Sequence, residues 1–311
     1  MRASNESHGR RTRRFFARYV VVMVLGAFAV VVSVSIRRLL TPLPYRQTVV
    51  VTGEPVYVLS IDAKRHRVTG LSLSSDTVIR GAHGVGKYSL GSLVSLDAID
   101  KRDGRLVTSS VSLSLGIPVT DVIIDTGVGD RGEMTVTSLR RIFSVRRKPK
   151  TTGWIAWLRL VRVMWALPVD ALRVIDVSSA ITTQVIPDGS MVPKVDESRI
   201  DSLLDNEFFD TDIRQESVSI AVYNTTQVPQ VAQEVARQLA RMGAKLVFVG
   251  NKEPGISRCR LLGDRSLLTS HAATFIRGTY GCSAYVDADR GKEIGADIIV
   301  ELGEEEASRY K

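Results

Sequence analysis

The glycine-rich string Gly81–Tyr88 (GAHGVGKY) contains the residue types that most directly suggest chemistry. Its spacing fits GxxxxGK, in which backbone amides and a lysine bind nucleotide phosphates, and the downstream DVIID ends in Asp125 like a magnesium-binding strand. Tyr88, however, occupies the position that requires a small hydroxyl, and Gly91 interrupts the helix that should follow. We therefore favour a glycine-rich surface loop over a nucleotide site.

Carboxylates are the second group with chemical potential, because any two of them can bind Mg²⁺ together with substrate phosphates. They are Asp62, Asp76, Asp97, Asp100 and Asp103. Without geometry, solvated turn residues remain the simpler interpretation. The histidines do not pair at ligand spacing, and there is no GxSxG segment typical of serine hydrolases.

Composition and charge limit the class of protein that positions these residues. The chain has 311 residues, of which 44% are hydrophobic and 24% charged, which indicates a globular protein of about two domains. The net charge is +9, but residues 1–18 alone hold six arginines and one glutamate. Residues 217–311 are nearly neutral, with twelve basic and eleven acidic side chains. This distribution argues against a nucleic-acid-binding groove.

The uncharged run Tyr19–Ile36 is 18 residues long and follows the basic arm of residues 1–18. As a helix it would cover about 27 Å, close to the thickness of a bilayer core. The alternatives are a cleaved signal peptide and a buried core helix. We predict a single-pass anchor in the cell membrane, with a cytoplasmic N-terminus and the bulk of the chain extracytoplasmic, because the heavier arginine cluster precedes the run. Residues 37–47 form a linker.

Hydrophobic patterning predicts two α/β domains after the linker, at residues 48–212 and 217–311. TVVV, VYVLSID, RVTGLSLSS and DVIIDTG are typical of strands, and SLVSLDAID of a helix. DESRIDSLLDNEFF predicts a helix capped by Asp196 or Ser198. The C-terminal segment predicts the order β-α-β, a short strand, then α-β.

A tryptophan-bearing helix is predicted at residues 154–167, where Trp154, Trp157, Val161 and Trp165 recur at helical spacing. It follows the basic stretch of residues 140–150. Such a helix either lies on an anionic membrane surface or packs on the protein core, and the core is the commoner case.

Cys259 and Cys282 are the two cysteines of the chain. Outside the cytoplasm they can form a disulfide that closes a loop of about 24 residues, which contributes on the order of 3 kcal/mol. Two buried thiols are the alternative. Either way the pair concerns stability and not catalysis.

Several segments resemble the LytR-CpsA-Psr family of cell-envelope proteins. SVSIAVYNTTQVPQVAQEVARQLARMG is similar to the start of the LytR-type C-terminal domain, including an Asn-x-Thr-x-Val-Pro turn at 224–229, and GADIIVELG to its closing strand. Gln227 and Gln230 stand where glycines are usual. VYVLSIDAKRHRVTGLSLSSDTVI, GVGKYSLGSLVSLDA and SLGIPVTDVIIDTG resemble the family's catalytic domain in the same order. The resemblance implies an α/β/α domain followed by a small α/β domain.

Enzymes of this family transfer a glycopolymer from a polyprenyl pyrophosphate lipid to the wall, using arginines for the pyrophosphate and carboxylates for Mg²⁺. The resemblance places Asp76 and Lys87 at matching positions, Glu54 near a family aspartate, and Arg80 as a substitute guanidinium. Glu54 and Asp76 would bind the Mg²⁺. Ser75 stands where the family has an arginine, and serine cannot replace its charge-assisted bidentate contact.

We therefore predict a non-catalytic or weakly active envelope protein that acts as a scaffold or as a polyprenyl-lipid or glycan-binding module. The alternative is an active Mg²⁺-dependent phosphotransferase that attaches lipid-linked glycopolymer to the cell wall. The expected partners are the lipid bilayer and a polyprenyl-linked glycan or cell-wall polymer, and Mg²⁺ is the expected cofactor only in the catalytic case. A transcriptional regulator is disfavoured, because the C-terminal domain is nearly neutral and no helix-turn-helix pattern appears.

Overall fold

The computed structural model describes residues 43–124, 134–144, 152–185 and 189–310, together with isolated positions. These positions are Met23, Gly26, Val30, Ser33, Val34, Arg37, Thr41 and Pro149. Asp125 and most of the predicted anchor at 19–36 lie outside the described residues. Within the described part of the chain, no helix is long and apolar enough to cross a membrane.

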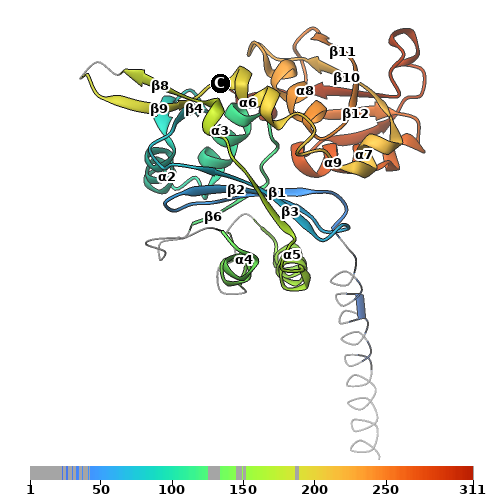
Figure 1. The fold of residues 1–311 in the computed structure, drawn as a ribbon. Coiled ribbons are helices and arrows are strands. Elements are labelled where there is room, and N and C mark those ends of the chain that lie inside the picture. Colours follow the sequence, from blue (N-terminus) through green and yellow to red (C-terminus); the bar gives the residue numbers. More distant parts are fainter. Residues whose placement is uncertain are drawn as a thin grey trace, which may run out of the picture.

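A five-stranded mixed sheet is the centre of the N-terminal half (Figure 1). Its order is β6 (Asp121–Ile123), β1 (Gln47–Val51), β2 (Val56–Asp62), β3 (Arg67–Leu73) and β7 (Leu172–Ile175). The three central strands are antiparallel to one another, whereas β6 and β7 run parallel to their neighbours. The predicted strands TVVV, VYVLSID and RVTGLSLSS are confirmed. β1 and β2 are buried along nearly their whole length, as expected for continuous apolar strands that are covered on both faces.

Helices cover both faces of this sheet, as Figure 1 shows. Alternate side chains of β1 and β2 point to opposite faces. Val49 and Leu59 belong to one core with α4 (Val136–Ile142) and α5 (Trp154–Ala166). Val50 and Val58 belong to the other core with α2 (Leu90–Ile99), α3 (Arg105–Leu115) and α6 (Glu197–Leu204). The predicted α/β/α layering is therefore observed.

The glycine-rich string forms a β-hairpin and not a phosphate-binding loop. It joins β4 (Val78–Gly81) to the antiparallel β5 (Gly86–Ser89), and these strands continue a small sheet with β9 (Met191–Val195) and β8 (Ile181–Val185). A phosphate loop would lead from a strand directly into a helix. Here the chain reverses through left-handed residues at His83 and Gly84, so Lys87 lies in a strand. The surface-loop interpretation is thus the correct one.

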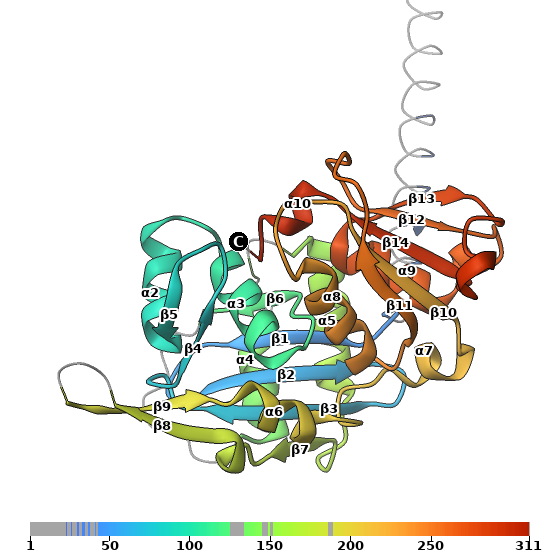
Figure 2. The ribbon, with the colours of Figure 1, turned by 90° about the horizontal axis from the view of Figure 1, so that it is seen from above.

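A second five-stranded sheet is formed by residues 219–302 (Figure 2). Its order is β11 (Lys245–Asn251), β10 (Ser219–Asn224), β14 (Ile298–Leu302), β12 (Arg260–Gly263) and β13 (Ser283–Val286). The main apolar core lies between this sheet and α7 (Thr211–Glu216), α8 (Val231–Arg241), α9 (His271–Tyr280) and α10 (Glu304–Ala307). The predicted strands and helices of this segment are present, and β13 is an additional strand that the sequence analysis did not predict.

The turn between β10 and α8 is held by its own polar side chains. The Asn224 side-chain amide donates to the Val228 carbonyl at 2.8 Å, and its Oδ1 accepts from the Thr226 amide at 3.0 Å. Gln230 adopts φ +65° directly before α8. The family that the sequence resembles usually has glycine at this position. A glutamine here therefore occupies the left-handed region that favours glycine.

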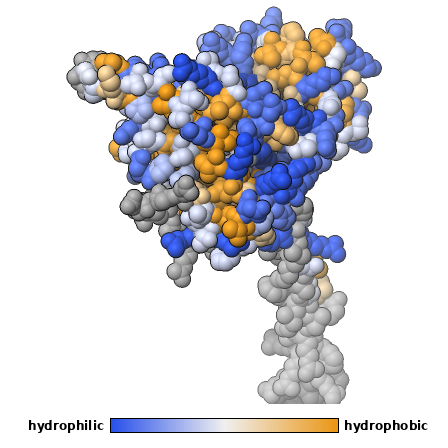
Figure 3. Space-filling model, viewed as in Figure 1, coloured by the Kyte–Doolittle hydropathy of each residue, from blue (hydrophilic) through white to orange (hydrophobic). Residues whose placement is uncertain are grey.

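Helix α5 packs on the core and also exposes tryptophans, so it has features of both interpretations of the tryptophan-bearing helix. Trp157 and Met164 are buried in the core, so the helix packs on the sheet as the commoner case predicts. The assumption that all three tryptophans share the core face is wrong: Trp154 is 57% exposed and Trp165 is 62% exposed. Trp154 is the first residue of the helix and Trp165 is next to its last residue. Figure 3 shows hydrophobic surface at the place of α5 in Figure 1.

Candidate functional site

The two candidate carboxylates belong to neighbouring turns at one end of the central sheet. Glu54 belongs to the turn between β1 and β2, and its Oε2 accepts a hydrogen bond of 3.1 Å from the Ser75 amide. Asp76 follows directly, and its own amide donates to Ser74 Oγ at 3.2 Å. Both carboxylates are exposed. Together they offer the two oxygen ligands that Mg²⁺ commonly takes from a protein when substrate phosphates supply others.

No larger metal-ligating group exists in the described ranges: nowhere do three or more His, Cys, Asp or Glu side chains gather in an arrangement that could hold a metal ion. The carboxylate pair is therefore not a preformed cage. It would hold Mg²⁺ only together with a phosphate-bearing substrate.

Arg80 and Lys87 form a separate pair on the hairpin. They lie directly opposite each other in the β4–β5 register, which places both side chains on the same face of the small sheet. Arg80 is engaged by carboxylates: its Nη2 lies 2.6 Å from Glu234 Oε1 of α8 and 3.4 Å from Glu197 Oε2 of α6. Lys87 is exposed. The Arg80 guanidinium, which the resemblance offered for phosphate binding, thus already has two carboxylate partners.

Asp76 and the basic pair line different hollows. Asp76 borders an open depression of about 470 Å³ beside the start of α2. Arg80 and Lys87 border a small cavity of about 20 Å³ whose other lining residues include Lys194 and Glu197. That volume holds about one water molecule and not a pyrophosphate. Neither of these two hollows contains all four predicted residues, and Glu54 lines neither.

The contact of Arg80 belongs to an ionic network between the two halves of the molecule. Arg237 of α8 donates to both carboxylate oxygens of Asp201 at 2.8–3.0 Å and to the Leu113 carbonyl of α3 at 2.8 Å. Arg241 donates to the same carboxylate at 2.5 Å. Burial lowers the pKa of Arg237, but the bonds and charge of Asp201 outweigh it and leave the pKa above its ordinary value. Arg80, Arg237 and Arg241 thus hold α8 against α3 and α6.

A cleft of about 460 Å³ lies further along the same boundary. One wall is formed by α3 and residues 118–120, and the other by α8, the end of α9 and the C-terminal segment. The wall of α3 is built from Arg105, Thr108, Ser109 and Ser112. Their spacing of i, i+3, i+4 and i+7 is the one signal by which the sequence could have revealed this face.

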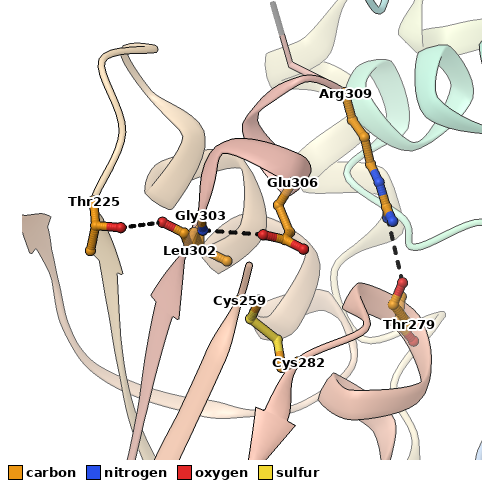
Figure 4. Close-up of a disulfide and its surroundings, with 8 residues drawn as sticks. All are labelled: Thr225, Cys259, Thr279, Cys282, Leu302, Gly303, Glu306 and Arg309. Atoms are coloured by element: carbon orange, nitrogen blue, oxygen red, sulfur yellow. Dashed lines mark hydrogen bonds between the residues drawn. A yellow bond between two sulfur atoms is a disulfide. The ribbon is translucent and has the colours of Figure 1, made fainter. Parts of the chain in front are cut away.

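The structure joins Cys259 and Cys282 in a disulfide, with a Cα–Cα distance of 4.4 Å, and both residues are buried (Figure 4). The bond connects the residues that precede β12 and β13. It also fixes the chain just after α9, whose last residues line the cleft. Figure 4 shows Arg309 extending to the Thr279 carbonyl on that same wall.

Comparison with solved structures finds proteins of low sequence identity to this chain. The LytR-CPS2A-psr family protein YwtF (TagT) of Bacillus subtilis, solved with bound octaprenyl pyrophosphate lipid, is 12% identical over 52% of this chain and 90% of its own, with a TM-score of 0.36. TagV of the same organism is 9% identical over 51% of this chain and 93% of its own, with a TM-score of 0.35. The neighbours are LytR-CPS2A-psr family proteins.

An Enterococcus faecalis protein described as a transcriptional regulator is 10% identical over 66% of this chain and 92% of its own, with a TM-score of 0.38. No protein-family model matches the sequence, and no curated protein matches it. At these identities and TM-scores the similarity concerns the fold in outline. We transfer no residue role, ligand or activity from it.

Proposed function

We propose that this protein is a membrane-anchored, extracytoplasmic envelope protein that binds a polyprenyl-linked glycan or wall polymer and does not transfer it. Its N-terminal α/β/α part would be a non-catalytic relative of wall glycopolymer ligases. Residues 217–311 would be a LytR-type C-terminal domain that serves as a scaffold.

The observation that carries the proposal is the separation of the candidate site into two hollows. Asp76 borders one, and Arg80 and Lys87 border the other. A phosphotransferase of this kind needs its cation and its guanidinium on the same leaving pyrophosphate. Arg80 instead bonds Glu234 at 2.6 Å, and Ser75 replaces the expected arginine beside Glu54. The residues that would neutralise the leaving group therefore do not converge.

Three features support the placement at the membrane surface. The predicted anchor ends at Ile36, and Leu43, seven residues later, is buried in the core that contains α4 and α5. At no more than about 3.6 Å per residue, the linker keeps that core near the bilayer. Trp154 and Trp165 are exposed on α5, as tryptophans at a membrane interface are. The disulfide suits an oxidising compartment.

The active Mg²⁺-dependent phosphotransferase remains the second candidate. The observation in its favour is the proximity of Glu54 and Asp76, which Ser75 connects. Catalysis would require Arg80 to leave Glu234, or Lys87 alone to hold the pyrophosphate.

Extraction of the full-length protein tests the binding role. The protein would be purified in mild detergent from membranes that make polyprenyl-linked glycans, extracted with organic solvent and analysed by mass spectrometry. We expect a polyprenyl phosphate or pyrophosphate in about stoichiometric amount. Its absence, with the same lipid recovered from an active family enzyme prepared in parallel, would contradict lipid binding.

The variant Ser75→Arg distinguishes the two candidates. It restores the missing guanidinium next to Glu54, and Ser75→Lys is the matched control because it adds charge without a bidentate fork. Transfer activity that appears only in Ser75→Arg would support a non-catalytic parent. Activity in the parent itself would support the phosphotransferase.

A further inference from the structure

We propose that the cleft between α3 and the C-terminal segment is a binding site for an anionic saccharide of the phosphorylated-sugar class. It is a different site from the one considered above, since none of Glu54, Asp76, Arg80 and Lys87 lines it. The inference rests on the proposed envelope role only for the choice of a sugar as the carrier of the anion. The anion site itself rests on the charges and geometry of the cleft.

The first step is the charge of the cleft. Arg105 contributes one guanidinium from α3, and Arg309 contributes another from the opposite wall. In the described part of the chain, no carboxylate lies within 4.0 Å of either group. Glu305 is the acidic lining residue, and its carboxylate lies 3.1 Å from Arg258, which does not line the cleft. The cleft therefore has a positive excess, with one arginine on each of its two walls.

The second step is the set of hydroxyl and amide groups beside these charges. Thr108, Ser109 and Ser112 continue the face of α3 that starts with Arg105. On the other wall the Gln238 amide donates to the Tyr310 hydroxyl at 3.3 Å, and its Oε1 accepts from Tyr280 at 3.0 Å. Burial raises the pKa of Tyr310 to about 12, so this phenol is neutral.

These groups match a ligand that carries one anionic group and several hydroxyls. Guanidiniums bind phosphate in bidentate geometry, and serine, threonine and glutamine side chains both donate to and accept from sugar hydroxyls. The Thr279 hydroxyl is buried without a hydrogen-bond partner among the described residues, which is unusual for a buried polar group. A volume of about 460 Å³ lies within the range of small-molecule sites and suits one or two sugar units.

The third step is that the walls are fixed in place. Gly104, at φ +91°, starts α3 where a Cβ would overlap the Val122 side chain. The buried Asp97 carboxylate accepts from the Gly104 amide at 2.6 Å and from the Leu106 amide at 2.7 Å, so its charge is used to cap the helix. On the other wall the disulfide holds the chain after Tyr280. A rigid cleft binds without an ordering cost.

Titration calorimetry of the full-length protein in non-ionic detergent tests the proposal with three probes: glucose 1-phosphate, inorganic phosphate and glucose. We expect glucose 1-phosphate to bind more tightly than either of the other two. Arg105→Ala and Arg309→Ala should each weaken its binding about 10-fold or more, because each removes a charge-assisted contact. Arg105→Lys keeps the positive charge but loses the bidentate guanidinium. Its affinity for glucose 1-phosphate should lie between that of the parent and that of Arg105→Ala.

Arg67→Ala is the matched control, because Arg67 is an exposed arginine of β3 that does not line the cleft. The affinity of Arg67→Ala for glucose 1-phosphate should stay within about twofold of that of the parent. No binding of glucose 1-phosphate at about 10 mM, or unchanged binding in Arg105→Ala, would overturn the proposal. Equal affinity for inorganic phosphate and glucose 1-phosphate would contradict the claim that the ligand is a saccharide. The lipid extraction above is independent, so either claim can fail while the other stands.

Discussion

Two regions of the same boundary use arginine in opposite ways. In the ionic network, Arg80, Arg237 and Arg241 are each bonded to carboxylates, and Arg237 also donates to carbonyls at the end of α3. In the cleft, Arg105 and Arg309 have no carboxylate within ion-pair distance among the described residues. Both regions contact the same helix, α3, one at its C-terminal end and the other at its N-terminal end.

This difference indicates which arginines hold the structure and which are free to bind a ligand. A guanidinium that is already bonded to carboxylates must give up those partly buried contacts before it can bind an external phosphate, and that exchange costs free energy. An unpaired guanidinium at a cleft carries no such penalty. The residue that the sequence resemblance offered for phosphate binding, Arg80, belongs to the first class. The arginines of the second class lie in a region for which the resemblance gave no role.

Arg237→Ala should produce the largest effect. Its side chain is 18% exposed and makes the bidentate bond to Asp201. Removal takes a donor from the Leu113 and Ser114 carbonyls, whereas Asp201 keeps its bond to Arg241. We therefore expect the free energy of unfolding to fall by about 2 kcal/mol. Urea unfolding of the full-length protein, followed by circular dichroism, measures the loss.

The control for this variant is Arg199→Ala, whose guanidinium is 60% exposed and lies 3.6 Å from Asp196. Its loss should change the unfolding free energy by less than about 0.5 kcal/mol. If the two variants lowered the unfolding free energy equally, the claim that the ionic network stabilises the structure would be contradicted.

Glu216→Gln should produce an intermediate, pH-dependent effect at a more exposed part of the boundary. Glu216 accepts from the His271 amide at 2.8 Å and the Ala272 amide at 3.1 Å at the start of α9. Burial raises its pKa, but these bonds and the His271 ring outweigh burial, and the folded-state pKa lies below 4.5. The ionised carboxylate therefore contributes stability above its unfolded pKa, and that contribution is lost as the pH falls through the folded pKa.

We accordingly expect Glu216→Gln to cost about 1 kcal/mol at pH 7 and progressively less as the pH falls through the folded-state pKa of Glu216. Thermal unfolding of parent and variant across this pH range measures the difference. A constant difference at all pH values would show that the charge of Glu216 has no part in it.

Gln230→Gly should stabilise the protein slightly. The substitution relieves the left-handed backbone at φ +65° that precedes α8, the helix that carries Glu234 and Arg237. The gain is partly offset by the greater freedom of glycine in the unfolded chain, so we expect about 0.5 kcal/mol. Gln227→Gly is the matched control, because Gln227 is an exposed residue of the same turn without positive φ. Gln227→Gly should not raise the free energy of unfolding, which urea unfolding of both variants measures.

Arg105→Ala should produce the smallest change, within about 0.5 kcal/mol of the parent. Alanine is a good helix residue, and no described carboxylate loses a partner. The same urea experiment measures it. A loss close to that of Arg237→Ala would mean that Arg105 is a structural residue, and the contrast between the two regions would disappear.

The sequence predicted β1, β2 and β3, the main strands of the second sheet, and the helices α2, α5, α6, α8 and α9, because their apolar patterns are strong. It did not predict the strands of the small sheet, β4, β5, β8 and β9, or the edge strand β7. It predicted the cap of α6, where Asp196 accepts from the Ser198 and Arg199 amides at 3.1 Å. It did not predict α3, whose end, VSLSL, alternates like a strand although its serines are buried against neighbours. Ser110 and Ser114, for example, bond to backbone amides of β4 and its turn. Such partners are distant in sequence and give no local signal.

The candidate site was predicted only in part for a similar reason. The positions of Glu54 and Asp76 in neighbouring turns follow from short local segments. The engagement of Arg80 by Glu234 joins residues 154 apart, and nothing near Arg80 in the sequence indicates it. The cleft likewise depends on how two halves of the chain meet. Its existence could not be predicted before the structure placed α3 against the C-terminal segment.

The most direct test of the account is a transfer assay with full-length protein, Mg²⁺, a labelled lipid-linked glycopolymer and cell-wall acceptor, beside an active family enzyme. Because the cation and guanidinium sites are separate, we predict no transfer above the protein-free blank, and no difference between the parent and Asp76→Asn. Mg²⁺-dependent transfer by the parent that is lost in Asp76→Asn would contradict the account and establish the phosphotransferase.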